Sequence, residues 1–205
     1  MNLPKNAIVN KIIPKQAFYN RLSISNKLKN EFIDKVRKIT WTYKLSEKTL
    51  NIDKSKNVEE IQIFQVELKG RDIPKNILKL IDKAIPYPIL FIFKFNQEYA
   101  YGISLKEDGV LENYYFSEWN EQIDFDFNGL NLEKVYQKII KKFIKDLDTD
   151  NKEFKEIVRD DAIIRDKERE LKILLDQRRR EKQFNQKVII NQKIKIKEEE
   201  LKKYK

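Results

Sequence analysis

The feature that most constrains this chain is one apolar run in an otherwise polar sequence, the seven residues Ile89-Leu90-Phe91-Ile92-Phe93-Lys94-Phe95. Pro86 and Pro88 precede it and end any helix that arrives there, because proline lacks the backbone N–H donor and disfavours helix in the residue before it. A short, bounded run of β-branched and aromatic residues is typical of a strand buried on both faces. The run therefore predicts the central strand of a sheet.

The segments around this run alternate between strand and helix periodicity. Apolar residues that alternate with polar ones predict further strands over 39–45, 61–68, 99–105 and 112–117, an edge strand over 123–127 and a candidate short strand at Leu50 and Ile52. Apolar residues three and four apart predict helices over 14–22, 26–38, 73–85 and 131–143, with Ser25 and Asn131 as the N-caps of the second and the last, and residues 1–13 are expected to form an arm. The fold class we expect is α+β, a mostly antiparallel sheet with helices on one face.

The composition changes near residue 149, and this change divides the chain. Residues 149–205 contain no glycine and no proline and are rich in Lys, Glu, Arg, Gln, Ile and Leu. Ile157, Ile164 and Leu171 recur at intervals of seven, which is a short heptad pattern. We therefore expect a globular domain over 1–148 and a long charged helical tail over 149–205, made of two helices with a break near 183–185.

The tail cannot bury its apolar residues by itself, because an isolated helix in water is stabilised by packing more than by propensity. The residues that need a second surface are Ile157, Ile164, Leu171, Leu174, Val188 and Ile190. Two arrangements satisfy this need and remain open: a hairpin that folds back on its own domain, and a hairpin or coiled coil that engages a protein partner or a second copy.

The composition excludes several classes of chemistry. The chain has no cysteine and no histidine, which removes disulfides, thiol nucleophiles, histidine general bases and zinc-finger ligand sets. Its four glycines form no phosphate-binding loop, so no cofactor is expected. No apolar run reaches the length of a membrane span, and no signal-peptide pattern precedes the domain. We expect a cytoplasmic protein that does not associate with a membrane.

One pattern could support catalysis. Glu67-Leu68-Lys69, on a predicted strand, resembles the Glu-x-Lys core of the restriction-endonuclease-like nucleases. With Asp53 as the upstream acid, the carboxylates would hold Mg²⁺ and Lys69 would activate water. The pattern is only three residues long in a chain that is 37% charged, so a solvated strand face produces it easily. The nuclease hypothesis requires these three side chains to converge.

A second pattern could support binding to nucleic acid. The chain has a net charge of +10, and residues 151–205, with 18 Lys and Arg against 12 Asp and Glu, contribute +6 of it. Its basic residues include a local cluster at Arg178, Arg179, Arg180, Lys182 and Lys187. Such a cluster can meet phosphates without sequence specificity, although a solvated helix face is the simpler account of it. A small nucleic-acid-binding module is therefore an alternative function.

Several segments carry a resemblance to the bacterial domain-of-unknown-function 4391 family. They are 14–19 (PKQAFY), 25–29 (SNKLK) with Phe32, 39–46 (ITWTYKLS) with Asn51 and Ile52, 60–66 (EIQIFQV), 81–87 (IDKAIPY), Tyr115 with 117–119 (SEW), 129–133 (GLNLE) and 181–188 (EKQFNQKV). The resemblance spans nearly the whole chain and implies no catalytic residues. It implies relatives encoded beside helicases and DNA methyltransferases in restriction-like or phage-defence loci.

Taken together, the residues and the resemblance predict a non-catalytic accessory or interaction subunit of such a system. Its expected partners are a protein or a second copy held through the C-terminal helices, including DNA-processing enzymes such as a helicase or a methyltransferase. The alternatives are the metal-dependent nuclease and the nucleic-acid-binding module, the latter with non-specific affinity.

Overall fold

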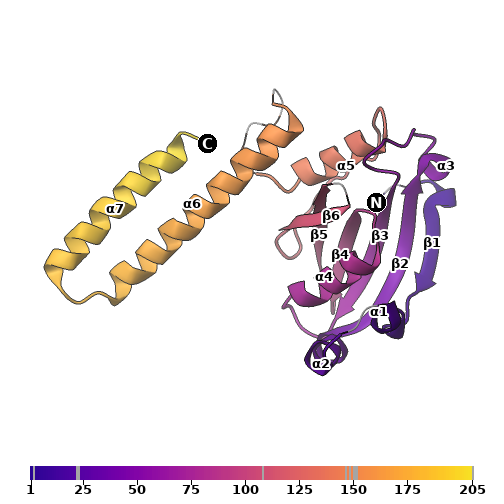
Figure 1. Ribbon diagram of the computed structural model, residues 1–205, viewed down its shortest axis with the longest axis horizontal. Coiled ribbons are helices and arrows are strands. Elements are labelled where there is room, and N and C mark those ends of the chain that lie inside the picture. Colours follow the sequence, from indigo (N-terminus) through magenta and orange to yellow (C-terminus); the bar gives the residue numbers. More distant parts are fainter. Residues whose placement is uncertain are drawn as a thin grey trace. The chain divides into compact units, whose positions relative to one another are not determined.

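The structure, a computed structural model, describes Met1 and residues 3–21, 24–107, 109–145, 147, 149 and 152–204. It divides into two compact units, Met1–Phe143 and Ile144–Lys205 (Figure 1). The first unit is built on a sheet and the second is helical. We predicted the division after residue 148, which lies outside the described residues, and the observed division falls five residues earlier. The predicted fold class is confirmed.

The first unit is organised around one sheet of six strands in sequential order. The strands are β1 (Ile8–Ile12), β2 (Val36–Ser46), β3 (Glu60–Leu68), β4 (Ile89–Phe95), β5 (Glu98–Glu107) and β6 (Val110–Phe116). Every neighbouring pair is antiparallel except β3 and β4, which are parallel. A parallel pair needs a crossover connection, and helix α4 (Lys75–Ala84) provides it.

The apolar run forms β4 and lies inside the sheet, as predicted. It pairs with β3 on one side, where Phe91 is opposite Phe64, and with β5 on the other, where Phe91 is opposite Gly102. Ile89, Leu90, Phe91 and Phe93 are fully buried. Because side chains of a strand alternate between faces, this burial shows that both faces of the sheet are covered at β4.

Three helices cover one face of the sheet. They are α1 (Gln16–Arg21), α2 (Asn26–Lys35) and α4, and they contribute Phe18, Phe32 and Ile81 to a core shared with β3, β4 and β6. Ser25 caps α2, because its side-chain oxygen accepts a hydrogen bond from the backbone N–H of Leu28. Leu22, the last residue of the first predicted helix, lies outside the described residues.

Helix α5 (Leu132–Lys141) contacts β3 and β5 and begins at its cap Asn131, as predicted. The core that α1, α2 and α4 cover does not include the buried residues of α5. It also does not include Ile63 of β3 and Ile103 of β5, although both are fully buried. Since alternate residues of a strand face opposite sides, α5 covers the second face. The helices are therefore distributed over both faces, which is a broader arrangement than we expected.

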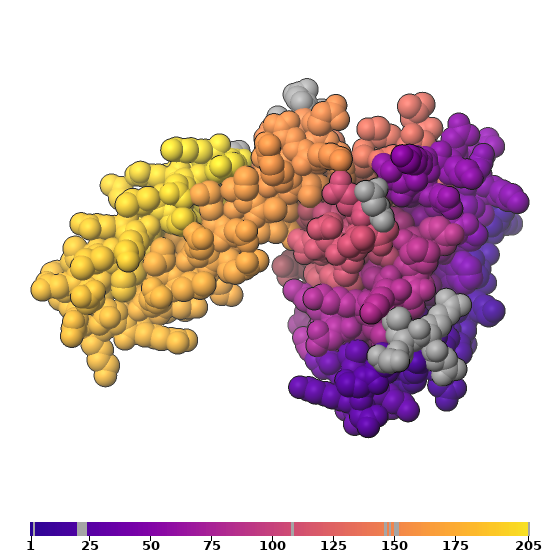
Figure 2. Space-filling view, viewed as in Figure 1, coloured from indigo at the N-terminus to yellow at the C-terminus, as the bar shows by residue number. Residues whose placement is uncertain are grey.

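The second unit is a helical hairpin of α6 (Phe154–Arg180) and α7 (Phe184–Lys202), broken close to the predicted position. The two helices pack side by side along their length (Figure 2). Ile157 and Ile164, two of the predicted heptad residues, are buried. Within the described residues, no helix has the length and apolar character that crossing a membrane requires.

The seam on α7 differs from the prediction. Val188 is 40% exposed, whereas Ile194 and Leu201 are buried. Lys193-Ile194-Lys195-Ile196-Lys197 alternates like a strand in sequence, but it continues the helix. Tertiary packing against α6 overrides the local pattern. Of the two isoleucines in this stretch, Ile194 is buried and Ile196 is exposed, as on two sides of a helix.

Three other predictions in the first unit are wrong. The arm contains β1, which pairs with β2 through Ile8 and Tyr43 and extends the sheet. Leu50 ends a short helix, α3 (Glu47–Leu50), that starts directly after β2, and a 3-10 turn occupies Lys5–Ala7. Residues 123–127 form no strand. In each case the apolar pattern was too short to distinguish an edge strand, a short helix and a loop from one another.

Gly102 tests the packing at the centre of the sheet. A Cβ at this position would lie 2.9 Å from ring atoms of both Phe93 and Phe116. We expect Gly102→Ala to lower the free energy of unfolding by about 1–3 kcal/mol, because the rings must shift in a packed core. Urea denaturation measures the change. Gly70→Ala, where a Cβ meets nothing within 4 Å, is the control, and equal losses in both variants would refute this account.

Glu200 tests the hairpin. Hydrogen bonds from Lys167 of α6 and Lys197 of α7 lower the pKa of its carboxyl from 4.5 to about 2. A lowered carboxyl pKa stabilises the folded state above pH 4.5, and this contribution is lost as the pH falls toward 2. NMR titration should find a pKa of Glu200 near 2. In Lys167→Met/Lys197→Met it should return toward the ordinary value, and an unchanged value would exclude these pairs as the cause.

Candidate functional site

The structure does not bring together the three residues of the nuclease hypothesis. Glu67 and Lys69 lie at the end of β3 next to α2, because Lys69 N–H donates to the carbonyl of Lys35 at 2.9 Å. Asp53 lies beyond the other end of β3, where its carbonyl accepts the N–H of Leu132 at the start of α5. In Figure 1, α2 and α3 lie at the two ends of β2, the antiparallel neighbour of β3. The length of β3 therefore separates Asp53 from Glu67.

The carboxylate of Glu67 is already engaged by two neighbouring side chains. Its carboxylate lies 3.7 Å from the Lys38 ammonium and accepts a 3.4 Å hydrogen bond from Gln65. Among the described residues, no group of three or more acidic side chains is placed to hold a metal ion. The arrangement of Asp53, Glu67 and Lys69 that the nuclease hypothesis requires is therefore not formed.

The predicted basic cluster lies at the end of the hairpin where α6 turns into α7. Arg178 donates to Asn191 across the hairpin at 3.4 Å, and Arg179 lies 3.8 Å from Asp176. Within the described part of the chain, the side chains of Arg180, Lys182 and Lys187 have no carboxylate partner. These five residues lie where α6 ends and α7 begins, at one end of the hairpin.

The same end exposes an apolar stripe that the sequence analysis assigned in part to the seam. Phe184, Val188, Ile189 and Ile196 of α7 are all exposed, Phe184 at 77%. Successive helix residues rotate by about 100°, so Val188, Ile189 and Ile196 lie on the side of α7 opposite the seam residues Ile194 and Leu201, and Phe184 lies at the edge of that side. Residues 178–197 hold eight basic residues and one acidic residue. We call this surface the outer face of α7.

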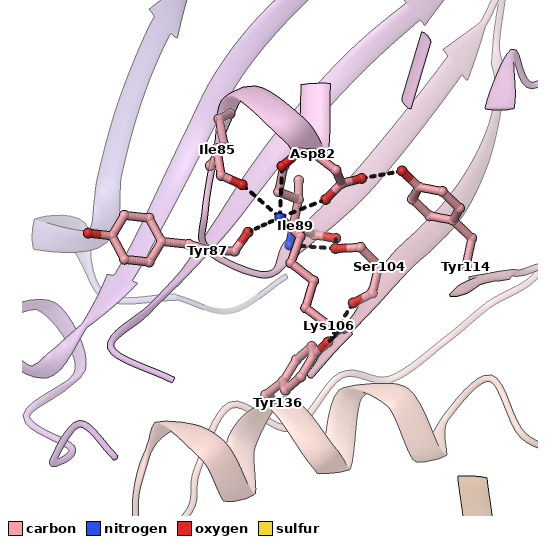
Figure 3. A network of polar contacts seen from close by, with 8 residues as sticks. All are labelled: Asp82, Ile85, Tyr87, Ile89, Ser104, Lys106, Tyr114 and Tyr136. Carbon is pink, nitrogen blue, oxygen red and sulfur yellow. Dashed lines mark hydrogen bonds and ion pairs between the residues drawn. The ribbon is translucent and has the colours of Figure 1, made fainter. Parts of the chain in front are cut away.

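A buried ion pair lies inside the first unit and was not found from the sequence. Lys106 of β5 places its ammonium 3.0 Å from the carboxylate of Asp82 on α4, and the two side chains are 2% and 1% exposed. The ammonium also donates to the carbonyls of Asp82, Ile85 and Tyr87 at 3.2, 2.7 and 2.9 Å (Figure 3). All of its hydrogen-bonding capacity is used inside the protein.

Tyrosine and serine side chains extend the network on both sides. Tyr114 donates its hydroxyl proton to the second carboxylate oxygen of Asp82, and Ser104 accepts the N–H of Ile89 at 3.0 Å (Figure 3). From α5, the hydroxyl of Tyr136 donates to the carbonyl of Ser104 at 2.6 Å and accepts the N–H of Lys106 at 2.8 Å. The network thus connects α4, the start of β4, β5, β6 and α5.

Burial sets the electrostatics of this network. Desolvation raises the pKa of Asp82 and lowers the pKa of Lys106, while the opposite charge of each partner acts against the shift. Desolvation and the nearby Asp82 also raise the pKa of Tyr114, so its hydroxyl keeps its proton. Each charge is tolerated because the other is present, and the network has no exposed nucleophile or base. Its role is to hold the residues between α4 and β4.

A cavity of about 330 Å³ lies beside this segment. Its walls are mostly apolar and come from α1, from the facing residues Trp41 and Phe64, and from residues 84–87 after α4. Glu60 and Gln62 bring polar groups to one wall. Volumes of this size are typical of small-molecule sites with apolar walls and few polar groups.

One sequence signal pointed to this region without revealing it, because Pro86 and Pro88 mark a stiff connection. Lys106 lies one residue beyond the strand predicted over 99–105, so the sequence did not place it in the core. Neither pattern names a partner. The pairing of Lys106 with Asp82 depends on a crossover that brings α4 over β5, which no local pattern encodes.

Comparison with known proteins gives one match. The family model described as Domain of unknown function (DUF4391) matches residues 1–201. Neither the curated proteins nor the solved structures include a match to the chain.

The buried pair generates a test of stability. We expect Lys106→Met to lower the free energy of unfolding by about 3–5 kcal/mol, because it leaves the Asp82 carboxylate buried without its counter-charge. Lys138→Met, which breaks an exposed 2.7 Å pair with Asp126, should cost only about 0–1 kcal/mol. Adding Asp82→Asn to Lys106→Met should recover part of the loss. Urea denaturation compares the variants, and similar losses for Lys106 and Lys138 would contradict the assignment.

Proposed function

From its membership of the DUF4391 family, to which the chain belongs over residues 1–201, we propose a non-catalytic interaction subunit of a bacterial restriction-like or phage-defence system. The α6–α7 hairpin is its docking element, and a DNA-processing enzyme such as a helicase or a methyltransferase is its partner. The residues that suggested nuclease activity do not form one site, which favours a binding role over a catalytic one.

The observation that carries this proposal is the outer face of α7. A helix that packs only on its hairpin partner normally has polar residues on the opposite side. Here the opposite side exposes Val188, Ile189 and Ile196, and Phe184 is exposed at its edge. An exposed apolar stripe rimmed by charged residues is typical of a protein–protein contact surface.

The charge of this face selects the kind of partner. Lys182, Lys193 and Lys195 are exposed beside the apolar stripe, and Glu181 is the one acidic residue between 178 and 197, while the exposed Glu198 and Glu199 follow the stripe at its C-terminal end. Two copies meeting through the same face would bring like charges together, which disfavours association. An apolar groove with an acidic rim on a different protein would satisfy both the stripe and its charges.

The test uses the full-length chain with a purified helicase and a purified methyltransferase from the defence system that we propose for it. We expect a complex with one of them by size-exclusion chromatography with light scattering. Val188→Glu/Ile196→Glu should weaken it by at least about 100-fold, because charges replace the apolar anchors. The measurement is the dissociation constant from isothermal titration calorimetry.

Two controls keep the test specific. Lys172→Glu/Arg169→Glu changes exposed charges on α6, away from the apolar stripe, and should leave most of the affinity. Circular dichroism should find the same helix content in all variants. Full affinity in Val188→Glu/Ile196→Glu, or self-association of the wild-type chain through this face, would overturn the proposal.

The basic cluster supports a second candidate function, binding of nucleic acid. Arg180, Lys182 and Lys187 lack carboxylate partners among the described residues, so their charges are available to phosphates. Replacing all three by Gln should reduce the slope of log affinity against log salt concentration by about 2–3, since each phosphate contact releases condensed counterions. Fluorescence anisotropy with a labelled duplex measures the slope. An unchanged slope would show that these residues do not bind nucleic acid.

A further inference from the structure

We propose that the exposed side of α4 binds the phosphate backbone of a nucleic-acid duplex without reading its sequence. This surface belongs to the first unit, so it is separate from the basic cluster of the hairpin that supports the second candidate function. It also does not depend on the docking role of the hairpin. Three observations support the proposal: a row of lysines without acidic partners, the polar composition of that row, and the state of the rings beside it.

The exposed side of α4 carries the row of lysines. Lys75, Lys79 and Lys83 are exposed and follow one another at intervals of four residues. Four residues rise by about 6 Å and make slightly more than one helical turn, so the three side chains lie along one side of the helix. The structure describes all of α4, and Asn76 is its one other exposed residue. We call this surface the lysine row of α4.

The lysine row has no acidic counterpart. Among the described residues, no carboxylate lies within ion-pair distance of the row, and this includes the exposed Glu112 of the neighbouring strand β6. The one acid of α4, Asp82, is buried and paired with Lys106. Asp72, just before the helix, pairs with Lys35 of α2 at 2.6 Å. Like charges four residues apart destabilise a helix, and a polyanion bound along the row would neutralise them.

Helix α5, which has the same length, provides a contrast. Its exposed Lys134 and Lys138 are also four residues apart. However, Lys134 donates to Gln137 at 3.1 Å, and Lys138 pairs with Asp126 at 2.7 Å and donates to the carbonyl of Asn128 at 3.0 Å. The lysines of α5 are thus engaged by polar groups of the protein, whereas the charges of the lysine row remain available to a ligand.

The composition of the row favours nucleic acid over a protein partner. The apolar residues on the inner side of α4, such as Ile77, Leu80 and Ile81, are buried, so the row offers no apolar anchor. Protein–protein contacts depend on such anchors, which the outer face of α7 has. A phosphate backbone is bound chiefly through lysine and arginine charges, and the row presents these without apolar surface.

The rings beside the row favour a duplex over a single strand. The Lys75 ammonium lies 5.5 Å from the ring centre of Phe116, and the Arg71 guanidinium lies 5.6 Å from that of Trp119. Both rings also pack against the core of the first unit, so they are occupied by contacts within the protein. Single-strand sites combine charge with rings on which bases stack, whereas a duplex needs only the charges. The same contacts hold the two cations in place before a ligand arrives.

A matched pair of variants tests the row. Lys79→Gln/Lys83→Gln removes two charges from it, and Lys134→Gln/Lys138→Gln removes two lysines at the same spacing from α5. With the full-length chain and a labelled DNA duplex, fluorescence anisotropy measures the slope of log affinity against log salt concentration. The α4 variant should reduce the slope by about 1 per lysine, because each phosphate contact releases condensed counterions. The α5 variant has the same net charge and should keep the wild-type slope.

A second background separates this surface from the hairpin. The α4 substitutions are repeated in Arg180→Gln/Lys182→Gln/Lys187→Gln, where they should reduce the slope by the same amount. If only the hairpin substitutions change the slope, the second candidate function holds and the lysine row does not bind. If only the α4 substitutions change it, the reverse is true.

Competition and NMR complete the test. A duplex of unrelated sequence should bind equally well, because phosphates carry no sequence information. A single strand of the same length and polyglutamate should each compete at least about tenfold more weakly. In the wild-type chain, the duplex should shift the backbone amide signals of α4 and not those of α5, and this decides the matter even if a variant does not fold. No duplex binding by the wild type, equal slopes for the α4 and α5 variants, or equal competition by either polymer would overturn the proposal.

Discussion

The first unit depends on one buried charge, the ammonium of Lys106. An ammonium inside a sheet is costly unless it is paired and fully hydrogen-bonded, and here one carboxylate and three carbonyls meet both conditions. The three carbonyls belong to the segment that leaves α4 and enters β4. The ion pair therefore fixes the one crossover that makes β3 and β4 parallel, and with it the wall of the cavity.

The second unit follows a different physical rule. Its helices bury one seam and leave a second apolar stripe on α7, so the hairpin alone does not satisfy all of its apolar surface. Cross-hairpin ion pairs such as Lys167–Glu200 set the register of the two helices, while the stripe remains exposed. In the docking role that we propose, stability and interaction are assigned to opposite sides of one helix, so the hairpin can stay folded before it meets a partner.

Much of the architecture could be predicted from local patterns. The 89–95 run, the Ser25 and Asn131 caps and the break before Phe184 each depend on chemistry within a few residues, and each is found where it was expected. The site residues could not be predicted in this way. Asp53 and Glu67 are close in sequence, but Asp53 lies beyond the start of β3 and Glu67 lies near its end, whereas Asp82 and Lys106 meet only because α4 crosses over the sheet.

The sequence by itself determined the class of elements, the division into a sheet-based unit and a charged hairpin, and the exclusion of cysteine and histidine chemistry, because composition and periodicity act locally. Only the tertiary structure decided which isoleucines of α7 face α6, that β1 joins the sheet, and that the lysine row of α4 stays exposed. These facts depend on contacts between distant segments, and the free energy of such contacts is set by packing and desolvation that no short stretch of sequence contains.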